Sequence, residues 1–145
     1  MSKVWVLQHS ECEDLGEIGP ILRTYGLVPQ YLPTYAGEPV PGNMGEAAAL
    51  LLLGGPMGVY DSGRYPFLRD EMRLIEQALA QECPVLGICL VCQLMAAVLG
   101  AEVRQGAAKE IGWHRVRLSA EARTDPLWSG APMAFTAFHW HGDIF

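Results

Sequence analysis

The sequence predicts a doubly wound α/β domain with a mostly parallel sheet. Short, continuous apolar runs alternate along the chain with stretches whose apolar residues recur at helical spacing. This alternation is typical of parallel strands that are covered by helices on both faces. One apolar run ends in a glycine pair, at residues 54–55, and another passes through Gly87 toward a helix. In a sheet of this kind functional groups gather at the carboxyl ends of the strands, so we expect the site there.

The first half of the chain contains three of the expected strands. Residues 33–45 are rich in proline and glycine, which predicts a loop. Leu50–Leu53 stops at Gly54-Gly55-Pro56, as expected for a central strand that is buried on both faces. The predicted helix and strands of this half are a strand at residues 4–7, a helix at 18–25, a strand at 28–32 and a strand at 50–53.

The second half begins with a clear helical pattern. Leu68, Met72, Ile75 and Leu79 recur at helical spacing and predict a helix over residues 67–80. From Glu102 onward the spacing changes toward two, which indicates β structure. The remaining predicted elements are a strand at residues 84–88, a helix at 93–99 and β segments that include 116–118 and 134–138.

The composition excludes several classes of protein. Half of the 145 residues are hydrophobic and 18% are charged, so a disordered role is excluded and a single domain over residues 1–145 is expected. A formal net charge of −6 argues against nucleic acid and anionic membranes as partners, because both need clustered lysine and arginine. The first residues lack the longer apolar stretch of a signal peptide, so none is expected, and no uninterrupted apolar stretch reaches about 18 residues. The four scattered cysteines do not suggest a disulfide framework, so we expect a cytoplasmic protein with reduced thiols.

The most informative stretch is Pro84-Val-Leu-Gly-Ile-Cys-Leu-Val-Cys-Gln-Leu-Met-Ala96, in which a strand runs directly into a helix with Cys89 at the corner. Such a turn lifts a nucleophile clear of the sheet and directs the first N–H groups of the helix toward a reacting carbonyl. The positive end of the helix should also lower the pKa of the thiol. Gly87 provides the room that a tight turn requires. We therefore interpret Cys89 as a nucleophile, against the plainer reading of a buried structural cysteine.

Gly87-Ile-Cys-Leu-Val-Cys-Gln93 resembles the G-x-C-x-G-x-Q elbow of the class I glutamine amidotransferases. Three further motifs resemble the same family and occur in the same order along the chain. They are Leu53-Gly-Gly-Pro-Met-Gly58, Lys109-Glu-Ile-Gly-Trp113 and His139-Trp-His-Gly-Asp143. Within the family the chain looks most similar to stand-alone domains that resemble the glutaminase part of GMP synthase.

The resemblance implies a flavodoxin-like fold and the hydrolysis of the glutamine side-chain amide. Cys89 would form a γ-glutamyl thioester, and the backbone N–H groups of Gly55 and Leu90 would stabilise the oxyanion of each tetrahedral intermediate. The residues that the resemblance assigns to substrate binding are Gln93, Trp140, His141, Gly142 and Asp143, the last four at the lip of the pocket.

The resemblance also implies which partners the protein has. The substrate would be glutamine or a related γ-glutamyl compound, and no cofactor or metal is expected. The released ammonia would pass to an acceptor, for example on a synthetase subunit. The chain carries no ATP-binding loop of its own, so the sequence does not identify the acceptor.

Two features depart from the family pattern. Val91 stands where the family usually has glycine, and a β-branched side chain there could shift the elbow and reduce activity. The family also takes its histidine base and the acid that orients it from a late F-H-P-E segment, which does not occur before Phe145. We therefore expect a domain that is incomplete at its C-terminus, one that is split, or one that a second copy of the chain completes.

His141 and Asp143 offer another source for the base. Residues i and i+2 on a strand face the same side, so this pair has a suitable geometry for a base and its orienting acid. The resemblance assigns both residues to the pocket lip instead, and the two readings stay open.

Other readings of the elbow are weaker. Cys89-Leu-Val-Cys92 is a C-x-x-C pair, which suggests redox chemistry, or zinc binding if His139 and His141 complete the ligands. Gln93 and the glycine turn would then have no role. A non-catalytic partner or regulatory domain is a third reading. For Cys92 itself, packing in the first helical turn is expected.

The remaining residues of interest have plainer expectations. His9 and His114 are expected at the surface or at strand ends, and Cys12 and Cys83 have no partner motif. The aromatic residues expected to lie mostly in the core are Trp113, Trp128, Phe135, Phe138 and Trp140.

Overall fold

The computed structural model of the protein describes residues 1–145 and divides into two compact units. Residues 1–104 together with 143–145 form the first, which we call the α/β unit. Residues 105–142 form the second, which we call the hairpin unit. The elbow belongs to the α/β unit, and most of the late motifs belong to the hairpin unit.

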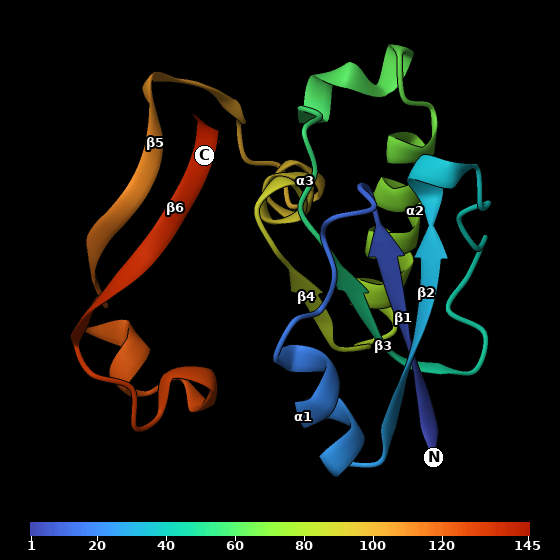
Figure 1. Cartoon of the computed structure of the whole chain (residues 1–145), viewed down its shortest axis with the longest axis horizontal. Helices are drawn as coiled ribbons and strands as arrows, with labels where there is room; N and C mark the ends of the chain where they lie inside the picture. The colour runs from blue at the N-terminus through green and yellow to red at the C-terminus, as the bar shows by residue number, and fades with distance from the viewer. The chain divides into compact units, whose positions relative to one another are not determined.

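The α/β unit is built on a four-stranded sheet (Figure 1). Its strands are β1 (Ser2–Gln8), β2 (Leu27–Pro33), β3 (Ala47–Leu52) and β4 (Val85–Gly87), in the spatial order β2-β1-β3-β4. All three neighbouring pairs run parallel. The chain moves outward from β1 first to one side and then to the other, which confirms the predicted doubly wound α/β fold.

Helices cover both faces of this sheet. α1 (Ile18–Thr24) packs on one face, and α2 (Phe67–Ala80) and α3 (Leu90–Val98) pack on the other. Within β1, Val6 belongs to the core on the α1 side and Leu7 to the core on the α2–α3 side, as the alternation of side chains along a strand requires.

No helix in the structure combines the length and the apolar character needed to cross a membrane.

The predicted elements of the α/β unit are confirmed, with shifts at their ends. The helix predicted over residues 67–80 is confirmed at both ends. The last helix begins at Leu90, three residues earlier than predicted, because it starts directly after the corner residue Cys89. Residues 33–45, predicted as a loop, contain one short 3-10 turn at Thr34–Ala36.

The hairpin unit is made largely of β5 (Arg104–Arg117) and β6 (Ala134–Ile144), which pair with each other in a two-stranded sheet. None of residues 105–142 is buried, because a two-stranded ribbon has no second layer to cover its side chains. The prediction that the late aromatic residues lie mostly in the core is therefore wrong. Trp113 is 74% exposed and Trp140 is 69% exposed.

Candidate active site

The carboxyl ends of three neighbouring strands meet at one edge of the sheet (Figure 1). β1 ends just before His9, β3 just before the Gly54–Gly55 turn, and β4 just before Cys89. A β-carbon added to Gly54 would lie 3.3 Å from Cβ of Cys89, and one added to Gly55 would lie 2.8 Å from Cβ of His9. The glycine turn therefore contacts both residues and leaves no room for side chains of its own.

Cys89 has an unusual backbone conformation at the corner between β4 and α3. Its φ of 54° and ψ of −110° put a residue with a side chain where glycine is normally needed. Glu82 is the other non-glycine residue with a positive φ, and it follows the end of α2, where a left-handed residue is common. Cys89 has no such ordinary reason, and strain of this kind costs on the order of 1–3 kcal/mol.

Gly87 is required by the close approach of α3 to the end of β4. A β-carbon at this position would lie 2.9 Å from the carbonyl carbon of Val91 and 3.0 Å from the backbone nitrogen of Cys92. These are backbone atoms, so they cannot move aside as a flexible side chain could. Val91 is itself fully buried, and its N–H donates to the carbonyl of Ile88 at 3.2 Å. The elbow thus accommodates this valine within the core beneath α3.

The Cys89 thiol is half-buried, and its surroundings raise its pKa. Burial is the largest cause, and the carboxylates of Glu13 and Asp143 act in the same direction. The backbone N–H of Leu90 opposes them by a hydrogen bond to the sulfur, as the start of a helix should. The prediction of a lowered pKa is therefore wrong, because desolvation and two nearby carboxylates outweigh the helix terminus.

The segments of the predicted oxyanion donors are in contact. A β-carbon on Gly55 would lie 3.2 Å from Cδ2 of Leu90, which is the first residue of α3. One turn further, Gln93 is 6% exposed. Between them, Cys92 donates from Sγ to the carbonyl of Cys89 at 2.8 Å. This contact agrees with the predicted packing role of Cys92 in the first turn.

A buried polar pair lies next to the glycine turn. His9 is 2% exposed and Glu71, on α2, is 0% exposed. Nε2 of His9 lies 3.0 and 2.9 Å from the two carboxylate oxygens of Glu71. Nδ1 lies 2.8 Å from the carbonyl oxygen of Leu53 and 3.1 Å from that of Gly54. His9 thus follows a strand end, as predicted, and is buried rather than at the surface.

Two opposing effects set the pKa of His9. Burial is the larger single effect and by itself lowers the pKa, because it disfavours the charged ring. The hydrogen bond to Glu71, its negative charge and the carbonyls of Leu53 and Gly54 all favour the charged ring. Together they raise the pKa of His9 above its usual value.

Three titratable side chains gather in the hairpin unit. Glu110 on β5 accepts a hydrogen bond from Nδ1 of His139 at 2.9 Å and lies 3.3 Å from Nε2 of His141. The bond from His139 is the main reason that the pKa of Glu110 is lowered. One ligand atom of each residue lies within 4.8 Å of the others, so these are the residues that could hold a metal ion. The group contains no cysteine, unlike the zinc site considered from the C-x-x-C pair.

The other residues predicted at the pocket lip are divided between the units. Trp140 alternates with His139 and His141 along β6 and so points to the opposite face of the hairpin. A β-carbon on Gly142 would lie 3.4 Å from Cγ of Lys109. Asp143 belongs to the α/β unit, where its carboxylate accepts hydrogen bonds from the hydroxyl of Tyr60 at 3.2 and 3.0 Å.

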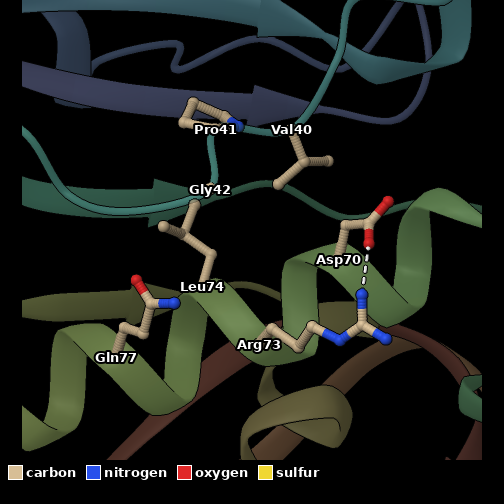
Figure 2. Close-up of a pocket in the computed structure, with 7 residues that line it drawn as sticks. All are labelled: Val40, Pro41, Gly42, Asp70, Arg73, Leu74 and Gln77. Atoms are coloured by element: carbon tan, nitrogen blue, oxygen red, sulfur yellow. Dashed lines mark hydrogen bonds and ion pairs between the residues drawn. The ribbon is translucent and has the colours of Figure 1, made fainter.

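A recess between the 40–42 loop and α2 has a different character from the elbow (Figure 2). Asp70 and Arg73 pair with each other there at 3.0 Å, and both side chains are mostly exposed. The recess contains no cysteine, serine or histidine, and its one carboxylate, on Asp70, is paired with Arg73. Its lining residues are Val40, Pro41, Gly42, Asp70, Arg73, Leu74 and Gln77.

Comparison with known proteins shows the family. A family model described as glutamine amidotransferase class-I matches residues 31–145. The chain belongs to the class I glutamine amidotransferase family. The resemblance of the four motifs is thereby confirmed.

Curated relatives of this amidotransferase chain are longer than the chain itself. The glutamine amidotransferase-like protein YfeJ of Salmonella typhimurium is 32% identical over 145 residues, which cover 98% of this chain and 61% of that protein. A glutamine-hydrolyzing GMP synthase of Leifsonia xyli is 40% identical over 98 residues, which cover 66% of this chain and 18% of that protein. The chain thus spans about three-fifths of the first relative and under a fifth of the second.

Solved structures of amidotransferases share the fold over the whole chain. A glutamine amidotransferase from Thermotoga maritima is 40% identical, with a TM-score of 0.90, and the match covers 99% of this chain and 62% of that one. A glutamine amidotransferase from Methylobacillus flagellatus is 31% identical, with a TM-score of 0.88, and the match covers 100% of this chain and 57% of that one.

The pairing of His9 with Glu71 in this amidotransferase was not predicted from the sequence. A signal for it was present, because Glu71 follows Leu68 by three residues and precedes Ile75 by four. That spacing puts Glu71 on the buried face of α2. A carboxylate on the apolar face of a helix needs a partner, so the spacing predicts a buried partner for Glu71 without identifying it.

Proposed function

We propose that this amidotransferase chain hydrolyses the side-chain amide of glutamine, or of a related γ-glutamyl compound, with Cys89 as the nucleophile. The sulfur of Cys89 attacks the amide carbon, and ammonia leaves with a proton from a general acid. A γ-glutamyl thioester remains, which water cleaves to the free acid and the thiol. One bond to sulfur forms and breaks in each cycle, so the cycle needs no oxidant or reductant.

The backbone of Cys89 is the observation that carries this proposal. A positive φ at a residue with a side chain supports a functional role, because such strain persists where the surroundings hold it for a purpose. The absence of room for a side chain at Gly87 supports a tight strand-to-helix elbow. Both features are typical of a turn that presents a nucleophile above the sheet.

The neighbouring segments support the other assignments of the proposal. The backbone N–H groups of Leu90 and Gly55 would stabilise the oxyanion, since Gly55 contacts Leu90 and Leu90 directly follows Cys89. Gln93 would hold the substrate. By the family resemblance alone, Trp140, His141, Gly142 and Asp143 would form the lip of the pocket.

The proposed chemistry needs a histidine base, because the pKa of the Cys89 thiol is raised. His9 is the one histidine among residues 1–104. Its two ring nitrogens already face Glu71 and the backbone carbonyls, so His9 is not available to accept the proton of the thiol. Of the other three histidines, His141 in the hairpin unit is the candidate that the sequence offers, and its Nε2 lies 3.3 Å from a carboxylate oxygen of Glu110.

The variant His141→Ala separates the two roles considered for that residue. If His141 is the base, formation of the thioester should fall to the level of a Cys89→Ala variant. If it belongs to the pocket lip, the thioester should still form at saturating glutamine while KM rises. Rapid quenching with labelled glutamine measures thioester formation directly.

The test of the whole proposal compares Cys89→Ala with Cys92→Ser in the intact protein. We expect wild type and Cys92→Ser to release ammonia from glutamine and to be labelled at Cys89 by a diazoketone analogue of glutamine. Cys89→Ala should show neither. A redox or metal-binding C-x-x-C pair would instead lose its function with either cysteine, and free-thiol titration with metal analysis would reveal it.

One outcome would favour a different class of protein. If the wild-type protein neither releases ammonia nor is labelled at Cys89, the chain is a non-catalytic partner or regulatory domain. The raised pKa of Cys89 is the observation that favours this second reading, because the thiolate is the nucleophilic form.

The similarity to GMP synthase supports a partner for the released ammonia. The matched region covers 66% of this chain and belongs to a protein described as glutamine-hydrolyzing. We therefore propose that ammonia passes to an acceptor on a synthetase subunit. Stimulation of glutamine hydrolysis by such a subunit would support this, and an unchanged rate would count against it.

A further inference from the structure

His9 and Glu71 form a fully buried pair to which the proposed reaction gives no role. Both side chains are 0% exposed, and the ring of Phe67 stacks on that of His9 with 6.0 Å between centroids. Apolar residues in place of a buried ion pair are often neutral or stabilising. Stability alone is therefore a weak reason for this pair, and its contacts point to another.

The contacts of the His9 ring determine where one of its hydrogens lies. Nδ1 faces the carbonyl oxygens of Leu53 and Gly54 at 2.8 and 3.1 Å. A carbonyl oxygen only accepts hydrogen bonds, so Nδ1 carries a hydrogen and donates it. Nε2 faces the carboxyl group of Glu71. This partner keeps the ring in its orientation, because the bond made by one ring nitrogen fixes the role of the other.

One of the two acceptors belongs to the peptide that carries a proposed oxyanion donor. The carbonyl of Gly54 and the N–H of Gly55 are the two polar sides of a single peptide group. No peptide bond in the chain is cis, so these two groups point in opposite directions. With its carbonyl held at His9, this peptide directs the N–H of Gly55 away from His9.

A pair of glycines does not hold such an orientation by itself. Neither Gly54 nor Gly55 has a β-carbon, so the peptide between them can rotate with little steric resistance. In the rotated form the carbonyl would replace the N–H and would present its negative end to a developing oxyanion. The contact between the turn and Cβ of His9 restricts the turn further.

We infer that His9, held in place by Glu71, is a positioning residue that locks the Gly54–Gly55 peptide with the N–H of Gly55 available to the oxyanion. The inference rests on the proposed function, since this N–H matters only if Cys89 attacks an amide. Neither side chain of the pair is assigned to the substrate. The lock therefore acts on the transition state and leaves ground-state binding alone.

Three variants separate this role from a merely structural one. The double variant His9→Leu with Glu71→Met removes the lock and fills its space with apolar atoms. Glu71→Gln is the conservative variant, because its amide can donate to Nε2 and leave the hydrogen on Nδ1. Asp70→Asn is the matched control, since it neutralises the adjacent, mostly exposed carboxylate on α2. Urea unfolding verifies that each variant is folded.

Two measurements on the intact protein report how strongly the oxyanion is stabilised. Glutamine hydrolysis gives kcat and KM, and the aldehyde analogue of glutamine forms a hemithioacetal with Cys89 that mimics the transition state. For the double variant we expect about a hundredfold loss of kcat, a comparable loss of aldehyde affinity and an unchanged KM. Glu71→Gln and Asp70→Asn should remain close to wild type in all three quantities.

The contrary outcomes are distinct from a failure of the proposed function. Wild-type kcat and aldehyde affinity in the double variant would overturn the inference, as would an equal loss in Glu71→Gln. A wild type that is inactive and unlabelled at Cys89 would refute the proposed function. The lock can then still be judged from crystal structures, because a Gly54–Gly55 peptide that keeps its orientation in the double variant overturns it and a rotated one supports it.

Discussion

Two histidine–glutamate pairs, one in each unit, meet at the same distance in different surroundings. His9 and Glu71 are 2.9 Å apart and have no exposed side-chain surface. His139 and Glu110 are also 2.9 Å apart, but their side chains are 24% and 49% exposed. Breaking the first pair leaves a polar or charged group in the protein interior, whereas breaking the second returns both groups to water. The two pairs therefore differ in their access to solvent and not in the distance between their partners.

Removing one partner of the buried pair should have the largest effect. Glu71→Ala leaves the ring of His9 without its partner in the interior, and we expect the free energy of unfolding to fall by about 3–5 kcal/mol. Glu110→Ala, the matched change in the hairpin unit, should cost far less. Urea titration of both variants measures the difference. Equal losses in the two variants would contradict the role given to burial.

A smaller effect should follow from crowding each region with one added methyl group. In Gly55→Ala the new β-carbon would lie 2.8 Å from Cβ of His9, and His9 cannot withdraw because both ring nitrogens are held. We expect a loss of about 1–3 kcal/mol. In Gly142→Ala the nearest atom is Cγ of the flexible Lys109 at 3.4 Å, so little change is expected. Thermal unfolding of the two variants tests whether the buried region is the more rigid.

The buried pair should also contribute to the pH dependence of stability, and this effect should be smaller than those of the substitutions above. The folded-state pKa of His9 is raised, so its stabilising contribution is fully present below the unfolded-state pKa of about 6.5. It is lost as the pH rises through the folded-state pKa. Wild type should therefore lose more stability above about pH 6.5 than the His9→Leu, Glu71→Met double variant. Parallel curves for the two proteins would show that His9 does not titrate in this way.

The smallest effect should come from neutralising the exposed pair. The pKa of Glu110 is lowered, chiefly by the hydrogen bond from His139, so its contribution is present at neutral pH and is lost as the pH falls through the folded-state value. Glu110→Gln should change the melting temperature at pH 7 only slightly, and added salt should remove the difference, since exposed charges are screened. A difference that survives high salt would indicate that the pair is shielded from solvent.

Much of the α/β unit could be predicted because its strands are buried on both faces. Such strands read as continuous apolar runs, and Leu50–Leu53 is one of them. The start of α3 could not be predicted in the same way, because Leu90 and Val91 are apolar and suit either a strand end or a helix. The position at which α3 begins depends on packing, namely on the close contact between α3 and the backbone at Gly87. In the hairpin unit the alternation of apolar residues predicted strands correctly, and it could not show that their aromatic residues are uncovered.

The candidate site was predictable where local geometry determines it. The corner at Cys89 and the tight turns at Gly55 and Gly87 follow from short motifs. The pKa of Cys89 does not, because it depends on burial and on Glu13 and Asp143, which are distant in the sequence. The partner of Glu71 was unpredictable for the same reason.

The strained backbone at Cys89 means that stability and chemistry favour different residues at this corner. Glycine at position 89 would relieve the positive φ, and only part of that gain would be offset by the greater freedom of glycine in the unfolded chain. The proposed nucleophile is thus held in place against the preference of its own backbone, by the neighbours that pack around it. Replacing this cysteine with glycine should therefore stabilise the fold and abolish the proposed reaction.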